Sequence, residues 1–233
     1  MARDTRARVI PYGLAVTAAV RALGEVIEDA RGLAFTLEAT GRREHVSLAF
    51  AGRHNVTNAL AAAAAGVAVG LTLPEIVAGL ERARPAKGRC VWRETGGVRI
   101  LDDTYNANPP AMRAALDTAL AHRGASRLVV VLGDMLELGS LADAAHTALG
   151  REVAERGAAE FVGLGRHMTL AVEAAREAGL AEAQHAMTFE DTVAHVLKRV
   201  APGDLVLIKG SRGMRMERVV DALVGRLARP EGR

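Results

Sequence analysis

"RLVVVLG", residues 127–133, decides the fold, and "DLVLIKG" at 204–210 has the same character. Both runs are almost continuously apolar, as strands are when helices cover both faces of a parallel sheet. Further strand-like runs occur at 90–94, 97–102, 159–164 and 184–188, and helical runs alternate with them at 109–122, 141–156, 166–178, 190–200 and 214–228. This alternation predicts βαβ units. We therefore expect a doubly wound, mostly parallel α/β sheet over residues 88–233.

Residues before 88 follow a different pattern. "LAFTLEAT" (33–40) and "HVSLAF" (45–50) alternate apolar and polar residues around a turn at 41–43, which predicts a hairpin, and a further strand is expected near 8–12. A helix is predicted over 55–70, ending at Gly70. A second helix is expected to begin at a capping box of Thr72 and Glu75, with Pro74 in its first turn. Residues 83–89 contain Pro85 and Gly88 and indicate a linker.

The composition excludes several classes of function. Half of the 233 residues are hydrophobic but only 3% are aromatic, and the net charge of +3 comes from interspersed charges. Neither a basic stripe nor stacking aromatics, the features of nucleic-acid binding, are visible. The single cysteine, Cys90, excludes disulfide scaffolds and cysteine-based zinc sites and favours a reducing compartment. No stretch has the ~20 apolar residues of a membrane span, and the start lacks a signal-peptide core, so we expect a cytoplasmic protein with no membrane partner.

Polar residues collect where the predicted strands end. Ligands of an open parallel sheet bind beyond the carboxyl ends of its strands. These positions hold Asp102, Asp103, Thr104, Tyr105, Asn106 and Asn108 after one strand, Asp134 and Glu137 after a second, Arg166 and His167 after a third, and Lys209, Ser211 and Arg212 after a fourth. This convergence predicts a site for a polar ligand such as a nucleotide.

Each of these residues also has a structural explanation. Asn108 before Pro109 is a good helix N-cap, and the adjacent carboxylates Asp102 and Asp103 could simply cap or be solvated. His146, in the helix after "GDMLELG", could face the site, or it could be a surface or packing histidine with no role in the site. Asn55 and Asn58, three residues apart, could cap a helix or present amides to a ligand. No two His or Cys residues have the spacing of metal ligands on a helix or loop, so a metal site built from them is not expected.

No P-loop motif, G-x-x-x-x-G-K-[ST], occurs in the sequence. The "GLG" at 163–165 is too short to count as a dinucleotide-binding fingerprint. If the protein works with ATP, its main phosphate-binding loop is therefore expected outside these residues.

Five segments together resemble a known family. They are "GRHNVTNALAAAA" (52–64), "KGR" (87–89), "LDDTYNANPPAMRAAL" (101–116), "GDMLELG" (133–139) and "LIKGSRGMRMERVVDAL" (207–223). Their order and content resemble the Mur ligases of peptidoglycan synthesis, and within them the MurF type, over about residues 8–225. This type joins D-Ala-D-Ala to UDP-N-acetylmuramoyl-tripeptide.

The resemblance implies a domain plan and a chemistry. Residues 1–87 would be the end of a central P-loop ATPase domain, and 88–233 a complete C-terminal Rossmann-like domain. ATP, with Mg²⁺ held by residues in the missing part, would phosphorylate the tripeptide carboxylate. The amine of D-Ala-D-Ala would then attack the acyl phosphate. The resemblance also implies a monomer, and the missing P-loop implies little or no ligase activity for this chain alone.

The resemblance also implies roles for individual residues. His54, Asn55 and Asn58 match the segment on the adenine side, Arg89 matches the arginine that reaches the ATP phosphates, and Asp103 matches the aspartate at the ribose, with Tyr105 and Asn106 beside it. Tyr105 stands where some members carry Lys. The implied catalytic residues are Arg89, Asp134 and Lys209, and the implied substrate-binding residues are Asp134, His146, Lys209, Ser211 and Arg212.

Two other functions stay open. One is a non-catalytic module that binds a nucleotide or peptide. The other is a Mur-type ligase that adds a different amino acid, although the absence of a "DNPR"-like segment argues against a diamino-acid ligase.

Overall fold

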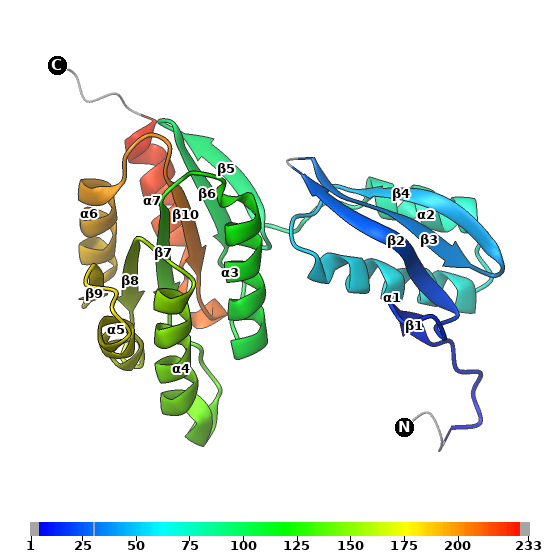
Figure 1. Cartoon of the computed structure of the whole chain (residues 1–233), viewed down its shortest axis with the longest axis horizontal. Coiled ribbons are helices and arrows are strands. Elements are labelled where there is room, and N and C mark those ends of the chain that lie inside the picture. The colour runs from blue at the N-terminus through cyan, green and yellow to red at the C-terminus, as the bar shows by residue number, and fades with distance from the viewer. Residues whose placement is uncertain (1–4, 30, 229–233) are drawn as a thin grey trace. The chain divides into compact units, whose positions relative to one another are not determined.

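The chain forms two compact units in the computed structural model, which describes residues 5–29 and 31–228 (Figure 1). The first unit extends to Pro85 and the second begins at Ala86, so the division falls inside the predicted linker. Among the described residues, every helix is too short or too polar to cross a membrane.

The first unit is a four-stranded sheet with two helices packed on it. The strands lie in the order β1 (Tyr12–Gly13), β2 (Val20–Asp29), β3 (Gly32–Ala39) and β4 (Arg42–Leu48), and the helices are α1 (His54–Ala68) and α2 (Leu73–Arg82). Alternate side chains of β3, including Phe35 and Leu37, are buried against apolar residues of both helices. This alternation is the pattern from which the hairpin was predicted.

The structure confirms most predictions for this unit. Strands β3 and β4 pair antiparallel, but the turn is at Thr40 and Gly41 and not at the predicted residues 41–43. Both turn residues have positive φ, as type I′ hairpin turns require. The capping box is present, because the Thr72 N–H donates to the Glu75 carboxylate at 2.8 Å. The strand expected near 8–12 is only the two-residue β1, and β2 was not predicted.

The second unit is the predicted doubly wound sheet, in the order β5-β6-β10-β7-β8-β9. Its strands are β5 (Val91–Thr95), β6 (Val98–Asp103), β7 (Leu128–Gly133), β8 (Glu160–Leu164), β9 (Ala183–Ala186) and β10 (Leu205–Lys209). All neighbours pair parallel except β5, which is antiparallel to β6. The helices are α3 (Pro109–Arg123), α4 (Ala142–Glu155), α5 (Met168–Glu177), α6 (Phe189–Arg199) and α7 (Glu217–Leu227).

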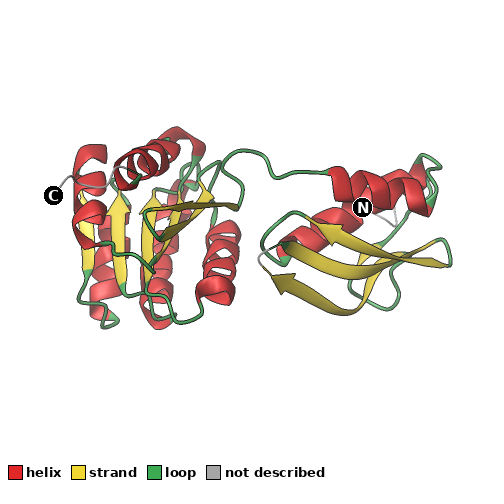
Figure 2. Ribbon diagram, turned by 90° about the horizontal axis from the view of Figure 1, so that it is seen from above, coloured by secondary structure: helices red, strands yellow, loops and turns green. Residues whose placement is uncertain are grey.

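Helices cover both faces of this sheet, as Figure 2 shows. Every residue of β7 and β10 is buried, which explains their continuous apolar sequence. Val129, Val131 and Ile208 belong to a core cluster with residues of α6 and α7. The register then places Lys209, the last residue of β10, beside Asp103 on β6 and Leu132 on β7. Polar groups from separate chain segments therefore meet at the carboxyl edge.

Candidate functional site

A buried ion pair lies at the centre of the carboxyl edge. Lys209 is only 3% exposed, and its Nζ donates to the Asp103 Oδ2 at 2.5 Å and to the Asn106 carbonyl at 2.8 Å. The other carboxylate oxygen of Asp103 accepts the Cys90 N–H at 3.1 Å. The pair therefore ties together the ends of β10 and β6 and the start of β5.

A stacked pair, Arg89 on Tyr105, lies beside this link at the surface. The Tyr105 N–H donates to the Gly88 carbonyl at 2.9 Å, which fixes the two segments side by side. The Arg89 guanidinium lies 4.0 Å from the Tyr105 ring centroid, and that of Arg212 lies 5.9 Å from it. Both distances allow cation–π attraction. A depression of about 200 Å³ lies here, lined by Lys87, Gly88, Thr104, Tyr105, Arg212 and Glu217.

The sequence leaves both a structural and a functional role open for Asp102 and Asn108, and both side chains make structural contacts. Asp102 is fully buried and accepts the Thr104 hydroxyl at 2.7 Å, while Arg93 lies 3.4 Å away. Asn108 accepts the Ala111 N–H at 2.8 Å, so it is the N-cap of α3. Asp102 therefore supports this segment from its buried side, and Asn108 caps the helix that follows.

Asp134 and His146 also bond inward. The Asp134 carboxylate accepts backbone N–H groups of His167 at 3.3 Å and Met168 at 3.0 Å, at the start of α5. The Nε2 of His146 accepts the Met135 N–H at 3.0 Å, which leaves its proton on Nδ1, 2.7 Å from the Ala142 carbonyl. The histidine therefore offers no proton to Asp134, although Nε2 lies 3.9 Å from its carboxylate. Both residues hold the 134–146 segment in place, and their predicted contact with substrate stays a prediction.

Ser211 joins the loops that follow three strands. Its hydroxyl oxygen accepts the Leu136 N–H at 2.8 Å, and its O–H donates to the Ala107 carbonyl at 3.3 Å. Its own N–H donates to the Asp134 carbonyl at 3.1 Å. Since the side chain is 3% exposed, these bonds are shielded from water.

Above Ser211 lies a cleft of about 340 Å³, which we call the three-loop cleft because residues 106–108, 136–138 and 211–213 line it. Glu137 and Arg212 bring opposite charges to this cleft. Glu137 has a positive φ of 66°, a conformation uncommon for residues other than glycine. Sequence reasoning placed Glu137 at this edge but gave it no role. The signal available was its position after the strand in "GDMLELG".

The predicted adenine-side residues lie in the first unit, at the start of α1. Asn55 donates its amide to the Ala51 carbonyl at 2.8 Å, and Asn58 donates to the Asn55 side-chain oxygen at 2.9 Å. Neither is the N-cap, a position that Arg53 occupies. His54 begins the helix. The hydrogen bond between the two amides shows that both side chains lie on the same side of α1. The contact of these amides with adenine stays a prediction.

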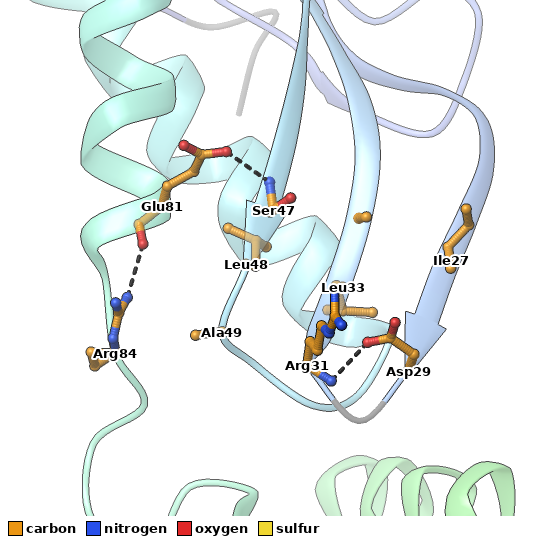
Figure 3. Close-up of a pocket in the computed structure, with 11 residues that line it drawn as sticks. Ile27, Asp29, Arg31, Leu33, Ser47, Leu48, Ala49, Glu81 and Arg84 are labelled. Carbon is orange, nitrogen blue, oxygen red and sulfur yellow. Dashed lines mark hydrogen bonds between the residues drawn. The ribbon is translucent and has the colours of Figure 1, made fainter.

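The first unit also contains a cavity of about 340 Å³, shown in Figure 3. The charged side chains of Asp29, Glu81 and Arg84 have local partners. Asp29 accepts the Arg31 N–H at 2.7 Å, and Glu81 accepts the Ser47 N–H at 3.1 Å. Arg84 donates to the Glu81 carbonyl at 2.8 Å, near the end of α2. These contacts join the sheet edge and the helix end, and they give the cavity no ligand preference.

Two family models match the chain. The model for the Mur ligase glutamate ligase domain matches residues 88–212, and the model for the Mur ligase middle domain matches residues 1–66. The matches fall on the second and first structural units, respectively.

Named relatives agree with these models. A UDP-N-acetylmuramoyl-tripeptide–D-alanyl-D-alanine ligase of Mycobacterium tuberculosis is 35% identical over 245 residues, covering 96% of this chain and 48% of the relative. A crystal structure of MurF from Acinetobacter baumannii superposes with a TM-score of 0.82 at 32% identity, covering 92% of this chain and 46% of that one.

A MurF ligase from Thermotoga maritima, solved with ADP, has the same fold, with a TM-score of 0.74 at 24% identity. That match covers 93% of this chain and 48% of the other. The chain thus spans about half the length of the proteins it matches.

Proposed function

Because the chain belongs to the Mur ligase family, we propose that it takes part in joining D-Ala-D-Ala to UDP-N-acetylmuramoyl-tripeptide with ATP. The observation that carries this proposal is the pair of adjoining depressions at the carboxyl edge, which share Arg212. One is flanked by Lys87 and Arg89, and the other has opposite charges on two of its loops. A ligase of this kind has to hold an anionic phosphate group beside an incoming amine.

Arg89 and Lys87 suit the ATP phosphates, because guanidinium and ammonium groups bind phosphate oxygens through charge-assisted hydrogen bonds. ATP supplies the phosphoryl group that activates the carboxylate. Asp103 is proposed to meet the ribose. Among the described residues no group of three or more His, Cys, Asp or Glu could hold a metal ion, so Mg²⁺ is expected to bind through other residues of the ligase.

The buried residues are proposed to position this machinery. Lys209, Ser211, Asp134 and His146 are each at most 4% exposed and are hydrogen-bonded to backbone groups of the surrounding loops. Arg212, which is exposed and lines both depressions, is the residue of the "KGSR" segment that we assign to direct substrate contact. Catalysis of this kind depends mainly on positioning and on neutralising phosphate charge.

A chimera tests the proposal. The half of the Mycobacterium tuberculosis ligase that matches this chain is replaced by this chain, and ADP release is measured with UDP-N-acetylmuramoyl-tripeptide and D-Ala-D-Ala. We expect turnover that needs both substrates and falls roughly 100-fold in Arg89→Ala, as when one stabilising donor is removed. The unmodified 233-residue chain, which contains no P-loop, is expected to give little or no turnover.

Circular dichroism and a cooperative unfolding transition establish that the chimera is folded. A folded chimera that accepts only a single amino acid in place of the dipeptide would contradict the assigned substrate. A folded chimera without any activity would contradict the proposed function. A cytoplasmic, monomeric enzyme remains the expectation from the sequence.

A further inference from the structure

We propose that Glu137 determines amine specificity, by binding the ammonium group of a zwitterionic dipeptide in the three-loop cleft. The inference rests on the proposed function, since that function supplies an amine-bearing substrate. It gives a role to Glu137, a residue that its position after the strand placed at this edge without assigning it one.

The charges in the cleft are the first observation. Glu137 lines the cleft from the 136–138 loop, and Arg212 lines it from the 211–213 loop. Asn106 contributes an amide from the third loop. A carboxylate on one wall with a guanidinium and an amide on the others matches a molecule that carries one ammonium and one carboxylate. The volume, about 340 Å³, is at the lower end of the range for small-molecule sites, roughly 300–1,000 Å³.

The second observation is that Glu137 has no competing partner. Within residues 5–29 and 31–228, its carboxylate makes no hydrogen bond and no ion pair. Two less exposed carboxylates nearby differ, because Asp134 and Asp103 are both bonded to protein groups. A solvated, unpaired carboxylate in a cleft can bind an ammonium group without first breaking an internal bond.

The third observation concerns how the Glu137 side chain is held. The Leu136 N–H is bonded to the buried Ser211 hydroxyl, so the residue before Glu137 is fixed to the β10 loop. Glu137 itself has a left-handed backbone conformation, which is unfavourable for a residue with a Cβ atom. The hydrogen bond at Leu136 and the constrained backbone of Glu137 together give the side chain a rigid support, as a specificity residue requires.

Nuclear magnetic resonance titration of the ¹⁵N-labelled chain tests this role, with D-Ala-D-Ala, N-acetyl-D-Ala-D-Ala and D-Ala-D-Ala amide as probes. We expect D-Ala-D-Ala to bind with a millimolar Kd and to shift amide signals of residues 106–108, 136–138 and 211–213. Glu137→Gln should weaken this binding roughly tenfold, which corresponds to about 1.4 kcal/mol. Glu137→Asp should recover part of the loss. Glu173→Gln, the same change on the exposed surface of α5, should bind as the wild type does.

The acetylated dipeptide separates charge recognition from shape. It should bind the wild type about as weakly as D-Ala-D-Ala binds Glu137→Gln, and that variant should not distinguish the two peptides. The amidated dipeptide lacks the carboxylate that Arg212 would bind. Arg212→Gln should therefore weaken the binding of D-Ala-D-Ala but not that of the amide.

Equal affinity of wild type and Glu137→Gln for D-Ala-D-Ala would overturn the inference, and so would shifts confined to another surface. In either case the dipeptide still binds, and the proposed function would stand. Absence of dipeptide binding at any soluble concentration would also overturn the inference, and the chimera would then report separately on the proposed function.

Discussion

Replacing Lys209 with Met removes the charge at the centre of the carboxyl edge while nearly keeping the side-chain volume. The Lys209 side chain is 3% exposed and that of Asp103 is 13% exposed. All three ammonium protons have acceptors close by, namely the Asp103 carboxylate at 2.5 Å, the Asn106 carbonyl at 2.8 Å and the Asp103 carbonyl at 3.4 Å. The substitution therefore leaves the Asp103 carboxylate without its cationic partner and the Asn106 carbonyl without this donor.

The magnitude follows from this geometry. Removing one partner of a buried ion pair costs about 3–5 kcal/mol, because the remaining charge loses its compensation. Asp103 keeps the Cys90 N–H and some contact with water, so we expect a value near the lower limit, about 3 kcal/mol. Because small domains are stable by roughly 5–15 kcal/mol, the second unit should remain folded.

Urea unfolding provides the assay. Trp92, the single tryptophan, lies on β5 beside β6 and reports on the second unit by fluorescence. At an unchanged slope of about 2 kcal/mol per molar, the midpoint should fall by roughly 1.5 M. Lys198→Met, a change at an exposed position on α6, should have little effect.

The double variant Lys209→Met/Asp103→Asn gives the result that could refute this reasoning. Since the second change removes the uncompensated charge, the combined cost should be about 2 kcal/mol less than the sum of the single costs. Additive effects, or a cost below about 0.5 kcal/mol for Lys209→Met, would show that the two charges are not coupled in the interior.

Two further predictions concern the surface. Tyr105→Leu should weaken calorimetric binding of inorganic pyrophosphate about 2- to 5-fold, because Arg89 loses a cation–π contact of about 0.5–1 kcal/mol, and Tyr105→Phe should not; equal weakening in both variants would rule out the ring face as the cause. The pKa of Glu75 is lowered by hydrogen bonds from the Thr72 hydroxyl and backbone N–H, so the carboxylate stabilises α2 above its usual pKa and this stabilisation is lost as pH falls through the lowered value. Thermal unfolding followed by circular dichroism at a series of acidic pH values should therefore depend less on pH in Glu75→Gln than in the wild type, and parallel profiles would contradict this assignment.

The sheet of the second unit was predictable because burial on both faces leaves a direct record in the sequence. Strands β7 and β10 are apolar throughout, and their boundaries agree with the predictions within a residue or two. Their order was not predictable, since β10 comes last in the chain but lies between β6 and β7. Strand β2 was missed because its burial does not alternate regularly and its pairing with β3 is irregular between Leu23 and Ile27.

The positions of the site residues were predictable, but the directions of their side chains were not. The rule for parallel sheets placed Asp134 and Glu137 together at the carboxyl edge. Asp134 bonds inward because its donors are the N–H groups of residues 167 and 168, more than thirty positions later in the chain. Glu137 lines a cleft that forms only where three loops meet. Long-range partners of this kind leave no trace in local sequence.

The carboxyl edge therefore has two kinds of polar residue with different physical roles. Lys209, Ser211 and Asp134 are buried and hydrogen-bonded, and they join loops that would otherwise move independently. Arg89 and Glu137 are exposed and are held by those loops. A site that acts by preorganised electrostatics needs both kinds, because a charge stabilises a ligand best when no reorganisation is required on binding. Substitution of a buried member should thus lower stability and ligand binding together, whereas substitution of an exposed member should lower binding alone.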